Sequence, residues 1–247
     1  MKTIGILGGM GPEATNKLAT LITSLTPVSK DQDHVPVISF NNSQIPHRIN
    51  AIFHNTKSPV PEMIRMAKGL EMLGADFLII PCNTAHYFIP EIQTHINIPF
   101  INMMDETVKF IVNNYPDTKK VGILGTNLTI KMGLYENPLM EKGIEVVIPS
   151  EDEEEKVMEA IYGIKGGLKD KGKAILIDAA KNLIESGAEV IIAGCTEIPL
   201  VLHQENLNFI LLDPSKIVAE SAINLASREE FIEEQRIHEI EILEEEE

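Results

Sequence analysis

The chain has 247 residues, 44% of them hydrophobic, which is enough to bury a core in one large domain or two small ones. It carries 21 Lys and Arg residues against 37 Asp and Glu residues, a formal charge of −16. This charge disfavours nucleic acid and anionic membrane surfaces as partners. Two cysteines are too few for a disulfide framework, and no Cys and His cluster has zinc-ligand spacing, so we expect a cytoplasmic protein without a metal. No apolar run approaches the roughly 18 residues that cross a membrane.

Short apolar runs alternate with longer amphipathic stretches, which is typical of parallel strands joined by helices. We expect strands, in chain order, at residues 3–7, 35–40, 77–80, 100–102, 121–124, 145–148, 190–193 and 209–212. Helical periodicity lies between them, for example at residues 60–73 and 174–185. Only 5% of the residues are aromatic and Trp is absent, so we expect an aliphatic core, as in buried parallel sheets. The sequence therefore predicts an α/β fold.

Segments of the first half recur in the same order in the second half. The sequence IGILG at residues 4–8 recurs as VGILG at 121–125, and GADFLIIPC at 74–82 recurs as GAEVIIAGC at 187–195. A weaker likeness sets residues 98–105, which end in Asp105, beside residues 207–213, which end in Asp213. These repeats predict two pseudo-symmetric lobes, each with a mostly parallel sheet flanked by helices. We assign residues 1–103 and 208–227 to the first lobe, with its last helix starting near Pro214, and residues 104–207 to the second.

Two acidic clusters have structural explanations. Residues 228–247 hold ten Glu and two Arg, so we expect a solvated or disordered extension without a function. At the second cluster, 151–155, Ser150 and Glu153 are spaced as a capping box, and carboxylates in a first helical turn favour the positive end of the helix dipole.

Each cysteine directly follows an apolar strand and precedes an expected helix, in Pro81-Cys82-Asn83-Thr84 and in Gly194-Cys195-Thr196-Glu197. Ligands bind at the carboxyl ends of the strands in α/β sheets. A helix N-terminus at that place can lower the pKa of a thiol from about 8.5 into the range of about 3.5–7.5. A lone free Cys is most often a small buried hydrophobic residue, but two at equivalent strand ends favour a functional pair.

Two facing lobes would place one sulfur on each side of a bound ligand. One thiolate could then remove a proton from a carbon while the other thiol delivers one to the opposite face, which is racemisation or epimerisation. A Cys–His hydrolase is the competing hypothesis, because His86 lies four residues after Cys82 and thus on the same face of a following helix. That hypothesis leaves Cys195 without a role, and a simple helix-face position for His86 stays open.

The turn after the first strand matches the dinucleotide fingerprint G-x-G-x-x-A at residues 9–14. The acidic residue of that fingerprint should end a second strand, whereas Asp31 and Asp33 precede the strand expected at 35–40. A tight turn that offers backbone N–H groups to a small anion explains the glycines equally well. The sequence therefore gives no firm indication of a nucleotide cofactor.

Four motifs resemble those of the cofactor-independent aspartate/glutamate racemases, and of the aspartate racemase branch in particular. They are Gly8-Gly-Met-Gly-Pro-Glu-Ala-Thr15, Pro81-Cys-Asn-Thr-Ala-His86, Gly125-Thr126 and Gly194-Cys-Thr-Glu197, and the likeness runs from residue 3 to about 226. The resemblance implies an active site in the cleft between two lobes, a small amino-acid substrate, a homodimer, and catalysis without pyridoxal phosphate or metal. It also implies that Cys82 and Cys195 are the two acid/base thiols. Because both positions are Cys here, we expect turnover in both directions.

The resemblance further implies which residues hold the substrate. Arg48 and Lys165, which on their own would be read as surface charges, would bind the side-chain carboxylate. The α-carboxylate and the amino group would be held by Met10, Asn83, Thr84, Ala85, Thr126 and Thr196. His86 and Glu197 would support these contacts from behind.

Three alternatives to an aspartate racemase stay open at this point. One is a glutamate or broad-specificity racemase, since the one methylene between aspartate and glutamate is worth only about 1–3 kcal/mol of discrimination. The second is a related isomerase or decarboxylase that acts on another acid, such as maleate or a hydantoin. The third is an amino-acid-binding protein without catalytic activity.

Overall fold

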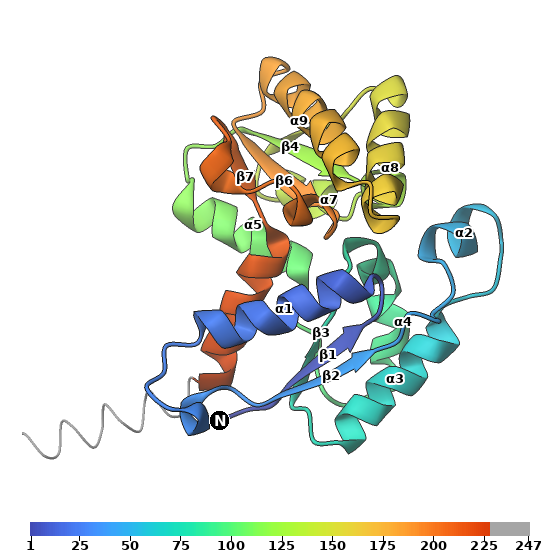
Figure 1. Ribbon diagram of the computed structural model, residues 1–247, viewed down its shortest axis with the longest axis vertical. Helices are drawn as coiled ribbons and strands as arrows, with labels where there is room; N and C mark the ends of the chain where they lie inside the picture. The colour runs from blue at the N-terminus through green and yellow to red at the C-terminus, as the bar shows by residue number, and fades with distance from the viewer. Residues whose placement is uncertain (228–247) are drawn as a thin grey trace, which may run out of the picture.

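The computed structural model describes residues 1–227 and contains two α/β lobes, each built on a parallel sheet with helices on its faces (Figure 1). The fold class expected from the sequence is confirmed. The acidic extension expected at 228–247 lies outside the described residues.

The first lobe is built on a sheet with the strand order β2-β1-β3. Its strands are β1 (Ile4–Gly8), β2 (Val37–Asn41) and β3 (Phe77–Ile79), and its helices include α1 (Pro12–Leu25), α2 (Arg48–Phe53), α3 (Val60–Met72) and α4 (Ile89–Gln93). Every residue of β1 and β3 is buried, because both strands are covered on both faces. This burial explains why both strands are continuous apolar runs rather than alternating ones.

The second lobe is built on a sheet with the order β5-β4-β6-β7. Its strands are β4 (Lys120–Gly125), β5 (Glu145–Val147), β6 (Val190–Gly194) and β7 (Ile210–Leu212). The helices in this half of the chain are α5 (Met103–Asn114), α6 (Asn127–Lys131), α7 (Glu136–Met140), α8 (Glu151–Lys165) and α9 (Lys169–Glu185). The capping box of Ser150 and Glu153 is confirmed at the start of α8.

The two sheets repeat one topology, as the sequence repeats predict. In the first, Leu78 of β3 pairs in parallel with Phe100; in the second, Ile191 of β6 pairs with Leu211 of β7. Leu78 and Ile191 each lie four residues before a cysteine. The expected strand at 100–102 is reduced to this single bridge, because the side chain of Asn102 already accepts from Met104 N to start α5.

The residues that correspond to each other at the ends of the two repeats differ from those suggested by the sequence. Asp213 corresponds to Asn102 rather than to Asp105: each directly follows the last paired segment of its sheet, and each side chain caps the next helix. Because β7 pairs with β6, residues 210–212 belong to the second sheet, which corrects their assignment to the first lobe. The rest of the expected lobe division stays a prediction.

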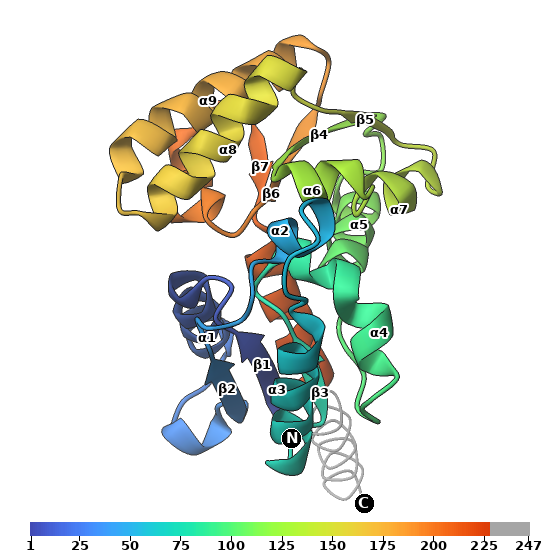
Figure 2. The same ribbon diagram turned by 90° about the vertical axis from the view of Figure 1, so that its right-hand side faces the viewer.

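The helices that end the two repeats are exchanged between the lobes. Helix 214–227 lies against the first lobe, where Lys2 N donates to Ala226 O at 3.0 Å beside β1. Helix α5 instead packs beside α7 in the second lobe. Both views show the last helix, in red, running down from the second lobe past β3 (Figures 1 and 2). The chain therefore crosses between the lobes twice, near residues 102 and 213.

Helix α9 begins five residues earlier than the periodicity indicates, at Lys169 instead of residue 174. Gly172 lies within this added first turn, where it allows close packing against α8. A Cβ atom at Gly172 would lie 2.6 Å from Ile164 Cγ1. A glycine that looks like a helix breaker in the sequence is therefore a helix–helix contact.

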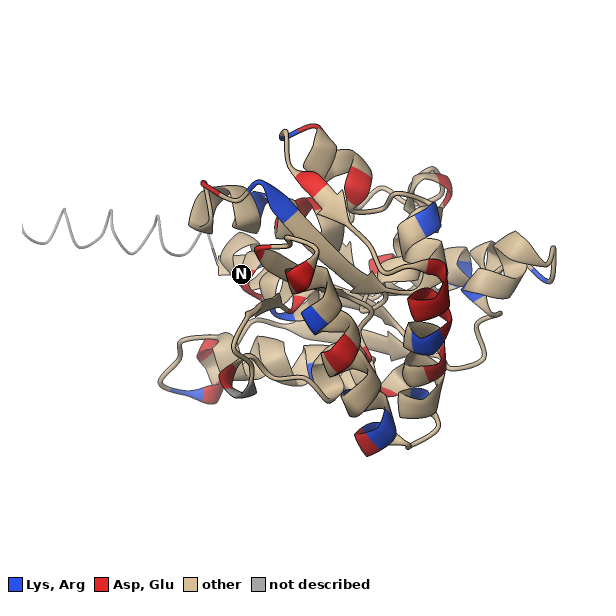
Figure 3. Ribbon diagram, turned by 90° about the horizontal axis from the view of Figure 1, so that it is seen from above, with Lys and Arg blue, Asp and Glu red and all other residues tan. Residues whose placement is uncertain are grey.

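In the view from above, Lys and Arg segments in blue are interspersed with Asp and Glu segments in red (Figure 3). Within residues 1–227, no helix is long and apolar enough to cross a membrane.

Gly9 and Gly74 provide a matched pair for testing how tightly the first turn is packed. Both have positive φ, +102° and +95°, but a Cβ on Gly9 would lie 2.0 Å from Asn42 O, whereas a Cβ on Gly74 meets nothing within 4 Å. We expect Gly74→Ala to lower the free energy of unfolding by about 1 kcal/mol through backbone strain alone, and Gly9→Ala by more than about 3 kcal/mol. Urea unfolding measures both, and equal losses would contradict the close approach.

Candidate active site

A pocket lies where the carboxyl ends of the two sheets face each other. It is lined by both cysteines together with Met10, His47, Arg48, Ile49, Asn83, Thr84, Thr126, Met158, Ile161, Tyr162, Lys165, Thr196 and Glu197. Its cavity volume of about 20 Å³ suffices for about one water molecule. An amino acid therefore needs the walls to move apart before it can enter.

Ten of the twelve residues named from the sequence line this pocket, and two do not. Ala85 is fully buried in the core of the first lobe, among side chains of α3 and α4. His86 is buried behind Cys82 and lines a different hollow. The other ten are Met10, Arg48, Cys82, Asn83, Thr84, Thr126, Lys165, Cys195, Thr196 and Glu197.

The two cysteines are free thiols, and both are buried, with exposed fractions of 7% for Cys82 and 5% for Cys195. The segments that follow them are short 3-10 helices, Asn83–Phe88 and Ile198–Leu200, and not the expected α-helices. The pKa of Cys195 is also opposite to the expectation: burial, reinforced by the nearby Glu197 carboxylate, raises the pKa of Cys195 well above its usual value. Cys195 is therefore a protonated thiol at neutral pH.

Glu197 touches the thiol directly, which the sequence did not indicate. Cys195 Sγ donates a hydrogen bond to Glu197 Oε2 at 2.9 Å, and Lys165 Nζ lies 3.6 Å from Glu197 Oε1. The carboxylate is only 5% exposed, so this contact with Lys165 offsets part of the cost of its burial. Burial would lower the pKa of Lys165, but Cys195, Glu197 and Cys82 outweigh it and raise that pKa. The ammonium group therefore stays charged in the pocket.

His86 supports the Cys82 segment through the backbone and does not reach the Cys82 thiol in the arrangement seen. His86 Nε2 accepts from Met103 N at 3.2 Å, so the ring is the tautomer whose Nδ1–H donates to Cys82 O at 2.9 Å. Burial lowers the pKa of His86 to about 4. Both ring nitrogens are occupied by backbone groups, which argues against the Cys–His hydrolase hypothesis.

Threonines from the two repeats join the lobes at the pocket. Thr84 Oγ1 and Thr126 Oγ1 lie 3.1 Å apart, and Thr196 Oγ1 donates to Pro81 O at 3.4 Å. Thr126 also caps α6 by accepting from Thr129 N. Thr84 and Thr196, which follow the two cysteines closely in sequence, thus each have a hydrogen-bond partner from the opposite lobe.

One side of the pocket is formed by the cations Arg48 and Lys165 together with His47, which was not among the residues expected from the sequence. Arg48 is the first residue of α2 and donates to Pro46 O at 3.0 Å. His47 caps α2 and stacks on Tyr162 of α8, with ring centroids 6.0 Å apart. Burial, followed by the charges of Arg48 and Lys165, lowers the pKa of His47. No motif marks His47 or Tyr162, because they meet only when the lobes are in place.

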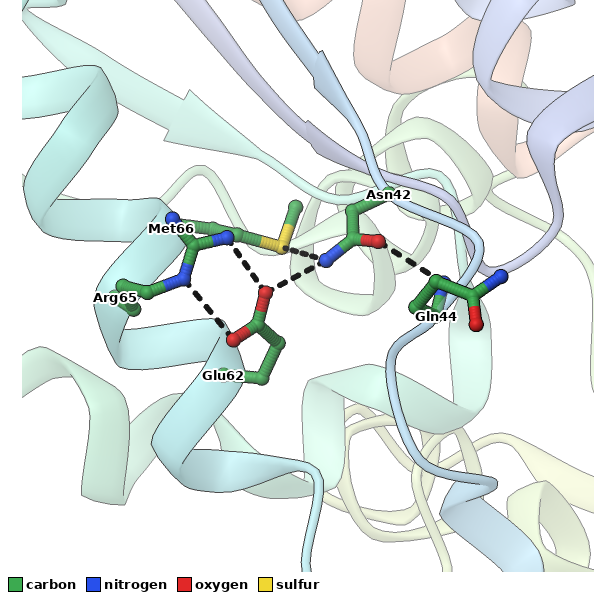
Figure 4. Close-up of polar contacts among 5 residues, drawn as sticks. All are labelled: Asn42, Gln44, Glu62, Arg65 and Met66. Carbon is green, nitrogen blue, oxygen red and sulfur yellow. Dashed lines mark hydrogen bonds and ion pairs between the residues drawn. The ribbon is translucent and has the colours of Figure 1, made fainter.

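A polar cluster anchors the segment that carries Arg48. Asn42, just after β2, donates from Nδ2 to Glu62 Oε1 at 2.6 Å and accepts from Gln44 N at 2.9 Å (Figure 4). Glu62 in turn holds Arg65, whose NH2 lies 2.6 Å from its Oε1. The segment from β2 to α2 therefore leaves the sheet from a fixed point.

The glycine turn after β1 does not present a free phosphate cradle. Gly9 N donates to Thr15 Oγ1 at 2.9 Å, so this N–H group already has a partner. Asp31 and Asp33 lie in a 3-10 helix before β2 and not at its carboxyl end. Both observations weigh against the dinucleotide interpretation of residues 9–14.

The two facing lobes, with a cysteine at each equivalent strand end, place both thiols at one pocket. A sequence profile of the Asp/Glu/Hydantoin racemase family matches residues 7–222. The chain belongs to this family, which makes it an isomerase.

Individual relatives support the same family. The chain is 30% identical over 225 residues to the broad specificity amino-acid racemase RacX of Bacillus subtilis, covering 90% of this chain and 96% of that protein. A glutamate racemase of Aquifex aeolicus is 29% identical over 179 residues, which cover 66% of this chain and 63% of that protein.

Among solved structures, the Picrophilus torridus aspartate racemase aligns with a TM-score of 0.82 at 32% identity, covering 92% of this chain and 95% of that one. An aspartate racemase homologue from Pyrococcus horikoshii aligns with a TM-score of 0.74 at 28% identity, covering 92% and 100%.

His86 should make the stability of the protein depend on pH. Its pKa is about 4 in the folded chain against 6.5 for the ordinary side chain. As the pH falls, the unfolded chain therefore protonates His86 at a higher pH than the folded chain does. Its contribution is fully present above pH 6.5 and is lost as the pH falls toward 4, by about 3 kcal/mol in total. We expect the free energy of unfolding of His86→Gln to fall less than that of the native chain between pH 7 and pH 4. Parallel curves would contradict this role.

Proposed function

We propose that the protein is an aspartate racemase in which Cys82 and Cys195 alternate as proton acceptor and proton donor at Cα. One observation carries the proposal: its two cysteines follow equivalent strands of a duplicated fold and line one pocket that also holds Arg48 and Lys165. The aspartate racemase named among the similar structures supports the choice of substrate. We also infer a homodimer, on the family likeness alone.

The reaction balances with the two sulfur atoms alone. The thiolate of one cysteine takes the proton from Cα, so the Cα–H bond breaks and an S–H bond forms, while the electron pair is delocalised into the α-carboxylate. The thiol of the other cysteine gives its proton to the opposite face of that carbon. The amino acid is inverted, and thiol and thiolate have exchanged places.

The raised pKa of Cys195 supports an assignment of the acid and base roles in the resting pocket. Cys195 begins as the thiol, so we infer that Cys82 acts as the base in the first half-reaction. In the reverse direction the Cys195 thiolate is a stronger base than an ordinary one, because a higher pKa means a higher proton affinity. Glu197 would receive no proton, and its hydrogen bond would orient the Sγ–H group of Cys195.

The charges of the pocket suit a substrate with two carboxylates. Arg48 and Lys165 provide two cations at a partly buried pocket, where their attraction to a carboxylate is stronger than in bulk water. The broad specificity of RacX makes other amino acids the alternative substrates.

An exchange assay in D₂O tests the proposal directly. We expect L-aspartate to lose its chirality while deuterium enters at Cα, and D-aspartate to reach the same end point. Chiral chromatography with mass spectrometry follows both changes. The same assay with glutamate and a wider panel of amino acids separates the alternatives, and neither racemisation nor exchange with any of them would refute the racemase.

Cysteine variants serve as the mechanistic control for that assay. Cys82→Ala and Cys195→Ala should each lose racemisation, and one-sided exchange at Cα remains compatible with the scheme. Native turnover in either variant would exclude the two-base mechanism.

Glu197 offers a separate test, because its carboxylate raises the pKa of Cys195. In Glu197→Gln that pKa falls, so more thiolate forms at neutral pH. In a Cys82→Ala background, we expect iodoacetamide to alkylate Cys195 about tenfold faster. In the chain with both cysteines, Glu197→Gln should slow racemisation, because the Cys195 thiolate becomes a weaker base. Glu13→Gln, which removes an exposed carboxylate paired with Lys169, is the matched control, and an equal effect there would count against the role of Glu197.

A further inference from the structure

A hydrogen bond between Tyr135 and Asn83 joins the two lobes behind the pocket. Tyr135 Oη, just before α7 in the second lobe, donates to Asn83 Oδ1, beside Cys82 in the first lobe. Tyr135 is fully buried and Asn83 is 2% exposed. Tyr135 does not line the pocket, so it reaches the site only through Asn83.

The other end of the Asn83 amide has no partner. Its Nδ2 is buried and makes no hydrogen bond within the described structure, although Asn83 lines the pocket. An amide nitrogen carries two donor hydrogens, and leaving them unpaired in a buried place is costly. A substrate carboxylate has the acceptor oxygens that would satisfy them.

Burial keeps Tyr135 a donor. It raises the pKa of Tyr135 well above its usual value, so the phenol stays protonated. The Tyr135 hydroxyl then occupies Asn83 Oδ1 in the closed arrangement, which leaves Nδ2 as the polar atom of this amide available to a ligand.

We propose that Tyr135 is a positioning residue that holds the Asn83 amide with its oxygen toward the second lobe and its nitrogen available to a substrate carboxylate. The proposal rests on the proposed function, because it assigns this donor to the amino-acid substrate. The orientation of Asn83 then depends on lobe closure, because Tyr135 reaches the Asn83 amide only when the two lobes are together. An open cleft would leave the amide free to rotate.

Tyr135→Phe, alone and combined with Asn83→Ala, tests the proposal. Phe keeps the buried ring and removes only the hydroxyl. We expect Tyr135→Phe to raise the KM for aspartate about tenfold with a smaller change in kcat, since the donor binds substrate without touching Cα. In the Asn83→Ala background the same change should alter KM less than about twofold. An equal factor in both backgrounds, or an unchanged KM in Tyr135→Phe, would overturn the proposal.

Tyr115→Phe is the matched control, because Tyr115 ends α5 outside the pocket and its variant should keep the native KM. If Tyr135→Phe does not fold, Asn83→Asp decides instead. Asp keeps an acceptor for Tyr135 but presents an oxygen where the amide nitrogen was, so its KM should exceed that of Asn83→Ala. A KM for Asn83→Asp at or below that of Asn83→Ala would overturn the proposal.

A readout without turnover separates this proposal from the racemase assignment. In a nitrogen-15 NMR spectrum, the side-chain amide signal of Asn83 is the one missing from Asn83→Ala. We expect it to move upfield in nitrogen in Tyr135→Phe, because its carbonyl loses an accepted hydrogen bond, and to stay in place in Tyr115→Phe. An unmoved signal in Tyr135→Phe would overturn the positioning role even in an active racemase. A native chain that racemises nothing would instead refute the proposed function.

Discussion

The pocket depends on a seam of buried polar groups that hydrogen-bond across the two lobes. Thr84 meets Thr126, Thr196 reaches the carbonyl of Pro81, and Tyr135 reaches Asn83. A buried polar group without a partner costs about 1–3 kcal/mol, so these contacts favour the arrangement in which the lobes are together. The contacts that join the lobes are also the ones that position residues beside both cysteines.

The sequence predicts the sheets and the cysteine positions well, because buried parallel strands are continuous apolar runs and the repeats mark their ends. It misses what tertiary packing decides. The helix dipole expected to acidify Cys195 is absent, and burial beside Glu197 raises the thiol pKa instead. Tyr162 and His47 carry no motif, since only the folded chain brings α8 and α2 together. The likeness of Asp105 to Asp213 also misleads, because the capping position is Asn102.

The charge of −16 says little about the pocket. The final twenty residues contribute half of it, with ten Glu against two Arg. Inside the pocket the balance is reversed, since two cations, Arg48 and Lys165, face one carboxylate, Glu197. That carboxylate is tied to both a cation and a thiol. One acidic side chain thus keeps a thiol protonated without cancelling the attraction of the pocket for an anion.

The exchanged helices bear on how such a chain could arise. Helix α5 follows the first sheet but packs in the second lobe, and helix 214–227 follows the second sheet but packs in the first. Two identical chains that traded their last helices would form this arrangement as a domain-swapped dimer, and joining their genes would preserve it in one polypeptide. Neither half of the present chain holds a complete lobe, so fragments cut between α5 and β4 should have to be produced together to fold.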